Sequence, residues 1–366
     1  MGFRCGIVGL PNVGKSTLFN ALTKTAAAAA ENYPFCTIEP NTGRVPVPDA
    51  RLNKISEMAK SAKTIETQMT FVDIAGLVRG ASKGEGLGNQ FLGNIREVDA
   101  IIHVLRCFED GDVTHVEGKI SPVDDAETVE TELMLSDLES LEKRRDNLIK
   151  KARGNDKEAM ANLIIVEAII PLLEAGKPAR LFEPKDADER KLVRGLQLLT
   201  TKPVLFVANV EEDAAPTGNA FSKAVQKMAE EKGAEAVIIS AAVEAEIAQL
   251  DEAEQKDFLE AIGLEETGLA KVIRAGHDLL ELITFFTVGP KEARAWTVRK
   301  GAKAPRAAGV IHTDFEKGFI RAETTSYQDF VAFGGEQGSK DAGKMRLEGK
   351  EYIVRDGDIM LFRFAN

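Results

Sequence analysis

A short glycine-rich segment near the start of the chain limits the possible folds more than any other feature. Residues Gly9–Ser16 read G-L-P-N-V-G-K-S, follow the apolar run Phe3–Val8 and precede a helical pattern at Thr17–Thr23. This order is that of a strand, a phosphate-binding loop and a helix, in which backbone N–H groups surround nucleotide phosphates. Lys15 would then reach the β- and γ-phosphates, and the hydroxyl of Ser16 would ligate Mg²⁺. The sequence therefore predicts a nucleotide-phosphate site.

Two further motifs fit the same site. The sequence Asp73-Ile-Ala-Gly76 follows an apolar pair, so Asp73 is expected beside Mg²⁺, acting through water, and the Gly76 N–H beside the γ-phosphate. Between the loop and this motif, the hydroxyl of Thr37 would complete the Mg²⁺ shell and close over the γ-phosphate as a switch. An Asp-x-x-Gly sequence alone is a weak signal. Its place after a phosphate loop makes it a strong one.

The segment after a later apolar strand predicts which base is bound. GTPases that carry such a phosphate-binding loop read guanine with the sequence Asn-Lys-x-Asp. The Asp of this sequence accepts hydrogen bonds from two N–H donors of the base. Here the sequence is Asn209-Val-Glu-Glu212, so Val210 replaces the Lys and Glu212 the Asp. The longer Glu displaces the carboxylate and leaves polar groups of guanine unpaired, which favours ATP over GTP. Asn209 and the backbone at Val210 are expected to hold adenine, with Ser240 and Ala241 in a companion loop; alternatively, Asn209 simply ends a strand.

Apolar runs alternate with helical patterns in the first hundred residues and again after residue 200, which is typical of a mostly parallel sheet with helices on both faces. The intervening residues, about 124–200, predict an antiparallel pair of helices at Thr128–Arg153 and Lys157–Ala175. Near its tip, Lys143–Lys157 contains seven basic and two acidic residues, a local charge of +5. This tip is a candidate RNA contact, or equally a structural arm with solvated charges.

The last segment, from about residue 282, is typical of a small α+β domain. Its β-like runs are 285–288, 295–298, 319–322, 352–354 and 359–364. Glycine-rich residues Gly334–Gly349 predict a mobile loop. Trp296 lies among basic residues that form either an RNA-facing patch or ordinary solvated charges, namely Arg294, Arg299, Lys300, Lys303 and Arg306.

Composition excludes several classes of protein. The 366 residues include 47 Lys and Arg against 58 Asp and Glu, a net charge of −11, so nucleic acid would have to meet a local basic patch. No apolar run approaches the roughly 18 residues that a membrane helix needs. The three separated cysteines suit a reducing compartment. We therefore expect a cytoplasmic protein that does not contact membranes.

Together these motifs resemble those of the YchF, or Obg-like ATPase, family of translation-factor-class P-loop proteins. The matching segments are 9–17, 35–41, 73–78, 80–90, 209–212 and 312–321. The resemblance implies an α/β P-loop NTPase domain of the OBG type over residues 1–277, interrupted by the hairpin at about 124–200. It also implies a C-terminal TGS domain of β-grasp fold over residues 281–364.

The same resemblance implies ligands and partners. Mg²⁺ is expected at Ser16 and Thr37, and ATP at Val210 and along the glycine-rich loop. The loop residues implied to contact ATP are Asn12, Val13, Gly14, Lys15, Ser16 and Thr17. Association with the ribosome is implied as well, with rRNA contact through the hairpin tip or the TGS domain.

Leu77 stands where Ras-like enzymes carry a Gln that orients the attacking water. An apolar side chain cannot orient water, so slow intrinsic turnover is expected. Asn12 resembles the Asn that coordinates K⁺ in related cation-dependent GTPases, and His115, in a polar loop, is a candidate for hydrogen-bonding the water. Lys15, Gly76 and His115 are therefore the candidate catalytic residues.

Two functional hypotheses remain open from the sequence. The first is an ATPase that acts as a nucleotide-controlled switch on the ribosome. The second is a ribosome or RNA adaptor that binds ATP and hydrolyses it incidentally, which Leu77 favours. Stimulation of turnover by ribosomes would distinguish them. His103, inside an apolar strand, is expected to be a hydrogen-bonded core residue rather than part of either mechanism.

Overall fold

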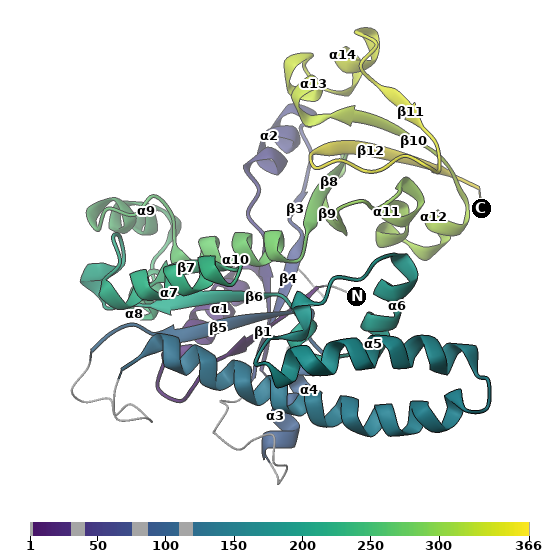
Figure 1. Cartoon of the computed structure of the whole chain (residues 1–366). Coiled ribbons are helices and arrows are strands. Elements are labelled where there is room, and N and C mark those ends of the chain that lie inside the picture. Colours follow the sequence, from purple (N-terminus) through teal and green to yellow (C-terminus); the bar gives the residue numbers. More distant parts are fainter. Residues whose placement is uncertain (1–2, 31–40, 75–86, 110–119, 366) are drawn as a thin grey trace. The chain divides into compact units, whose positions relative to one another are not determined.

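The computed structural model describes residues 3–30, 41–74, 87–109 and 120–365 (Figure 1). The described chain forms two compact units. The first consists of Met1–Val45 and Thr70–Gly276, and the second of Pro46–Met69 and His277–Asn366. Each unit has its own six-stranded sheet. Among the described residues, no helix is both long and apolar enough to cross a membrane.

The sheet of the first unit has the strand order β2-β4-β1-β5-β6-β7. Its strands are β1 (Arg4–Val8), β2 (Thr42–Pro46), β4 (Gln68–Asp73), β5 (Ala100–Arg106), β6 (Val204–Asn209) and β7 (Glu235–Ile239). All neighbours from β4 to β7 pair in parallel. Every residue of β5 is buried, as expected of a central strand with both faces covered. Because the strands are parallel, their carboxyl ends share one edge, where ligands of α/β proteins bind.

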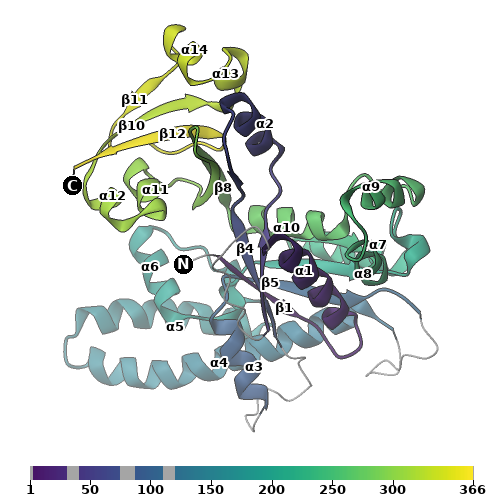
Figure 2. The same ribbon diagram turned by 180° about the vertical axis from the view of Figure 1, so that it is seen from behind.

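Helices cover both faces of this sheet, as the sequence predicted (Figures 1 and 2). One group packs α4 and α7 against β5 and β6, while α1 packs against β1 and α8. The helices are α1 (Lys15–Ala30), α3 (Leu87–Arg96), α4 (Pro122–Ala152), α5 (Lys157–Glu174), α6 (Ala187–Leu196), α7 (Ala220–Glu231), α8 (Ala241–Ile247), α9 (Glu252–Ala261) and α10 (Gly268–Leu279). Short 3-10 helices are η2 (Ala179–Leu181), η3 (Leu199–Thr201) and η4 (Glu212–Ala214).

Helices α4 and α5 form the predicted antiparallel hairpin, which Figure 2 shows extending from the sheet. Asn155 adopts a left-handed φ of 60° in the connecting turn. Asp156 then caps α5, its carboxylate accepting from the N–H groups of Glu158 at 3.0 Å and Ala159 at 3.1 Å. An apolar cluster that includes Leu141 and Ile165 holds the two helices together. The basic segment therefore lies at the tip, as predicted.

The second unit contains a sheet of order β11-β10-β12-β8-β9-β3. The strands are β3 (Thr64–Ile65), β8 (Leu282–Val288), β9 (Ala293–Arg299), β10 (Phe319–Ser326), β11 (Arg346–Glu348) and β12 (Asp358–Phe364). The helices are α2 (Ala50–Ala59), α11 (Ala304–Ile311), α12 (Thr313–Lys317), α13 (Tyr327–Ala332) and α14 (Glu336–Asp341). Parallel β8 and β12 are each flanked by an antiparallel neighbour, and α11 packs against the sheet, which is the arrangement expected of a β-grasp domain.

Two sequence predictions for this unit were wrong. The glycine-rich stretch from residue 334 to 349, expected as a mobile loop, contains helix α14 and strand β11. Its glycines permit close packing: a Cβ on Gly338 would lie 1.7 Å from the carbonyl oxygen of Phe333. The expected run 352–354 is not a strand, because Ile353 makes only a single bridge with Lys303.

Candidate nucleotide site and hairpin root

The glycine-rich loop connects β1 to α1 in a conformation that requires unusual backbone angles. Asn12 has a φ of 65° and Gly14 a φ of 90°, both in the left-handed region that favours glycine or asparagine. Gly14 is also constrained by space, because a Cβ there would lie 2.2 Å from Nδ2 of Asn209. Asn12 is exposed, while the side chain of Val13 is buried and anchors the loop to the core. The loop is therefore fixed to the core through Val13 and exposed to solvent at Asn12.

Lys15 and Asp73 form an ion pair at the carboxyl edge of the sheet. Asp73 ends β4 opposite Ile7 of β1, and its N–H donates to the carbonyl of Asn41 at 2.8 Å. Ser16 is exposed in the first turn of α1. Mg²⁺ prefers hydroxyl and carboxylate oxygens and retains several waters, so Ser16 and Asp73 are suitable donors for it. The structure thus brings the predicted phosphate lysine and the predicted metal-binding carboxylate to one place.

Asn209 ties this loop to the segments predicted to read the base. Its side chain is only 3% exposed, Nδ2 donates to the Val13 carbonyl at 2.9 Å, and Oδ1 accepts from the Ala241 N–H at 2.8 Å. A carboxamide has two hydrogens and two lone pairs, so these bonds use one of each. Sequence reasoning assigned Asn209 to the base and missed its bond to the phosphate loop. The alternative, that it merely ends a strand, ignores both of these bonds.

The remaining predicted base-site residues lie around Asn209. The N–H of Val210 donates to the Ile239 carbonyl at 2.8 Å, and its side chain is buried in the core. Glu212 is exposed at the start of η4. Ser240 is 2% exposed, and its hydroxyl has no hydrogen-bond partner among the described residues. Val210 thus has a packing role, while Glu212 is free to meet a ligand from solvent.

Several predicted functional residues lie outside the described residues. These are Thr37, Gly76, Leu77 and His115. Their assignments stay predictions.

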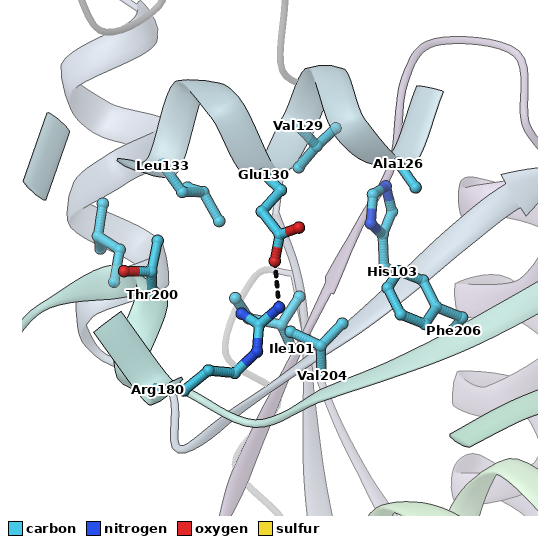
Figure 3. Close-up of a pocket in the computed structure, with 11 residues that line it drawn as sticks. Ile101, His103, Ala126, Val129, Glu130, Leu133, Arg180, Thr200, Val204 and Phe206 are labelled. Carbon is cyan, nitrogen blue, oxygen red and sulfur yellow. Dashed lines mark hydrogen bonds and ion pairs between the residues drawn. The ribbon is translucent and has the colours of Figure 1, made fainter. Parts of the chain in front are cut away.

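Sequence reasoning missed a charged cluster where the hairpin joins the sheet. The carboxylate of Glu130 on α4 pairs with Arg180 in η2 (Figure 3). It also pairs with Lys232 at the end of α7. Burial raises the pKa of Glu130, but the two cations outweigh it and hold that pKa below its usual value. Nearby, buried Asp137 accepts three hydrogen bonds, from the Leu199 N–H and from the N–H and hydroxyl of Thr200. No sequence motif marks these carboxylates, because α4 is rich in exposed acids too.

His103 lies beside this cluster, at a cavity of about 20 Å³ lined also by Glu130, Arg180 and Phe206 (Figure 3). The predicted burial is confirmed, since His103 is 3% exposed. The predicted hydrogen bonding is not found at Nε2, which has no partner within the described ranges. Burial lowers the pKa of His103 to about 4, so the ring is neutral at pH 7. The cavity is large enough for one water molecule, which would satisfy this nitrogen.

The loop, the parallel sheet and the carboxylate at the end of β4 define a P-loop nucleoside triphosphatase of the α/β class. Comparisons with known proteins agree. A family model described as "50S ribosome-binding GTPase" matches residues 4–136, and the model YchF-GTPase_C, described as a protein of unknown function, matches residues 282–365. The chain is similar to proteins named "Ribosome-binding ATPase YchF". That of Haemophilus ducreyi is 59% identical over 364 residues, covering 100% of this chain and 99% of the relative.

The relative in Bacillus subtilis is 53% identical over 366 residues and covers 100% of both chains. The solved YchF GTPase of Schizosaccharomyces pombe aligns with a TM-score of 0.89 at 38% identity, covering 99% of this chain and 98% of that one. The chain therefore belongs to the YchF family. A GTP-binding protein from Pyrococcus horikoshii shares the fold, with a TM-score of 0.62 at 20% identity and coverage of 99% and 100%.

Proposed function

We propose that this chain is a Mg²⁺-dependent ATPase that hydrolyses GTP poorly and acts as a nucleotide-controlled switch on the ribosome, in the cytoplasm. The observation that carries the base preference is the end of β6, where Val210 is buried and Glu212 is exposed. Both follow Asn209, whose side chain bonds the phosphate loop. No Lys and Asp stand there to read guanine. The bacterial relatives are named ATPases, whereas the fission-yeast relative is titled a GTPase, so base preference has to be argued from these residues.

The described residues account for binding and positioning of the triphosphate. Backbone N–H groups of the loop and the amino end of α1 would surround the phosphates, with Lys15 on the β- and γ-phosphates. Mg²⁺, when bound by Ser16, Thr37 and the water-mediated Asp73, would neutralise charge on the phosphate oxygens. Lys15 would exchange its contact with Asp73 for phosphate oxygens. Gly76 would sense the γ-phosphate through its N–H.

Positioning of the attacking water needs residues other than Leu77. We assign this role to His115, which would hydrogen-bond the water. We assign K⁺ coordination to Asn12, which is exposed in the phosphate loop. A second candidate function, an ATP-binding ribosome adaptor with incidental hydrolysis, is favoured by Leu77 alone. Turnover that ribosomes do not stimulate would support the adaptor.

Ribosome contact is proposed through the hairpin tip and the C-terminal domain. Lys143 and six other basic residues at the tip give it a charge of +5 within a chain of −11, and most of them are exposed. Such a patch is suited to phosphate oxygens of rRNA. We further propose that residues 281–364 form a TGS domain and residues 1–277 the OBG-type G domain, with about 124–200 as its insertion. Residues 46–69 of that range nevertheless belong to the second compact unit.

The test is competition between ATP and GTP for the purified protein, in K⁺ and in Na⁺, on the unmodified chain and on Glu212→Asp. The shorter carboxylate approaches the Asn-Lys-x-Asp geometry without forcing a Lys into the buried position of Val210. We expect ATP to bind more tightly to the unmodified chain, and the variant to gain affinity for GTP. Glu230→Asp, an equivalent change at an exposed site on α7, should alter neither affinity. Tighter binding of GTP than ATP to the unmodified chain would refute the base assignment.

A further inference from the structure

Residues 46–69 leave the first unit and become part of the second. They depart from β2 and return through β4, strands that are neighbours in the sheet of the first unit. The two strands are bonded at the nucleotide edge, where the Asp73 N–H donates to the Asn41 carbonyl at 2.8 Å. In sequence, the excursion lies between the two predicted Mg²⁺-binding residues Thr37 and Asp73. The chain that forms part of the phosphate site therefore continues directly into the second unit.

Helix α2 of this excursion belongs to the core of the second unit. Leu52 and Ile55 are both 0% exposed and belong to one apolar cluster with Phe286, Ala295 and Ile359 from β8, β9 and β12. Full burial of an aliphatic side chain stabilises the packed state. The two residues together therefore resist separation of α2 from the C-terminal strands.

Arg51 adds a polar clamp to this apolar contact. Its guanidinium pairs with Asp49, the residue that caps α2, at 2.8 Å and with Asp356 at 2.6 Å, and it lies over the ring of Phe286 at 5.4 Å. Asp356 also accepts from the Thr284 N–H at 2.9 Å. The clamp thus joins the first turn of α2 to the loop before β12 and to β8.

The remainder of the excursion is bonded along its length. Strand β3 adds in parallel to β9, and Thr67 shares a hydroxyl hydrogen bond with Thr297 at 2.7 Å. Further bonds are Ser61 Oγ to the Gly289 carbonyl at 2.7 Å, Ala62 N–H to the Pro290 carbonyl at 3.0 Å and Ala293 N–H to the Lys63 carbonyl at 2.9 Å. Residues 50–67 are therefore bonded or packed to the second unit along their length, and a movement of β2 or β4 cannot be taken up within them.

We propose that residues 46–69 are a tether that carries the nucleotide state of the phosphate site to the second unit, so that ribosome binding depends on whether ATP or ADP is bound. A shift of Asp73 moves β4, and with it β2, its neighbour in the sheet. Because α2 and β3 are packed and hydrogen-bonded within the second unit, we expect that unit to move with β2 and β4 while the tether keeps its structure. The inference rests on the proposed switch and names the segment that makes it work.

The test loosens the tether while leaving both ends intact. Gly-Gly-Ser is inserted after Pro48, between β2 and α2, and again after Glu66, between β3 and β4. The control carries the same tripeptide after Gly349, an exposed turn of the second unit. Affinity for purified ribosomes is measured with ADP and with a non-hydrolysable ATP analogue, and basal ATP turnover is measured separately.

We expect the unmodified and control proteins to bind ribosomes with clearly different affinities in the two nucleotides. The double-insertion protein should bind equally in both and keep its basal turnover. If it retains the unmodified ratio, or if the unmodified protein shows no difference between nucleotides, the tether proposal is overturned. Absence of ATP turnover in every protein would instead count against the proposed ATPase, and the affinity ratio would still test the tether.

Folding of the second unit is checked by the fluorescence of Trp296, the sole tryptophan of the chain, whose Nε1 donates to Thr287 Oγ1 at 2.9 Å. If the insertions disturb that signal, Arg51→Met replaces them, because it removes both ion pairs of the clamp and keeps the aliphatic stem. Its matched control is Lys54→Met, which removes the exposed pair with Glu57 on the same helix. Arg51→Met should reduce the difference between the two nucleotides without abolishing it, because Leu52 and Ile55 still hold α2. A difference equal to that of the control would overturn the tether.

Discussion

Asn209→Ala should loosen the phosphate loop before it changes anything else. The substitution removes two hydrogen bonds, to the Val13 carbonyl and from the Ala241 N–H, and leaves both groups without that partner. Each bond contributes about 0.5–1.5 kcal/mol, and each buried group left unpaired costs up to about 1–3 kcal/mol. Because the phosphate loop can relax or admit water, we expect its free energy of local opening to fall by about 2–4 kcal/mol, towards the lower end of these sums.

The assay is amide hydrogen exchange over residues 9–18 of the protein without nucleotide. A loss of 2–4 kcal/mol in the free energy of local opening corresponds to exchange faster by roughly 30- to 700-fold, at a tenfold change for each 1.4 kcal/mol. ATP affinity should fall as well, because the ligand must then order the loop. Asn147→Ala is the matched control: its Nδ2 donates to the Lys143 carbonyl at 3.2 Å on the exposed hairpin. Exchange within threefold of the unmodified protein would refute the structural role of Asn209.

Two further predictions follow from the same unit. Gly14→Ala should reduce ATP affinity sharply, because the new Cβ would lie 2.2 Å from Asn209 Nδ2 and the residue has a φ of 90°. In the double variant Gly14→Ala/Asn209→Ala this steric clash is absent. Calorimetry should therefore show a loss of ATP-binding free energy smaller than the sum of the two single losses. His103→Leu should weaken the decrease of the free energy of unfolding as the pH falls below 6.5. The pKa of His103 is lowered to about 4, so the unfolded chain binds a proton first and stability falls by about 3 kcal/mol as pH drops from 6.5 to 4. Urea denaturation at both pH values checks this, and an unchanged slope in the variant contradicts it.

The phosphate loop could be predicted because its chemistry is contiguous in sequence. Eight consecutive residues and their flanking strand and helix are sufficient to identify it, and the hairpin was likewise visible from the spacing of residues such as Leu141. The position of residues 46–69 in the second unit was not predictable in this way. It depends on contacts such as that of Arg51 with Asp356, which lie 305 residues apart. Local patterns carry no information on such pairings.

Buried charge was the other feature that sequence could not reveal. Glu130 and Glu127 both lie on α4 among similar neighbours, yet only Glu130 faces Arg180 and Lys232. The identity of its partners depends on how η2 and α7 pack, which is a property of the fold. Conversely, the roles of Thr37 and His115 rest on sequence reasoning alone and stay predictions.

The bonds of Asn209 bear on how base and phosphate recognition are related. One carboxamide joins the phosphate loop at Val13, the amino end of α8 at Ala241 and the end of β6, from which Glu212 follows within three residues. A base that pushes Glu212 or β6 out of place would therefore strain the loop that holds the phosphates. Discrimination between ATP and GTP would then affect how well ordered the phosphate loop is, as well as the affinity for each nucleotide. On this argument GTP, even when bound at high concentration, should leave the loop amides of residues 9–18 less protected than ATP does.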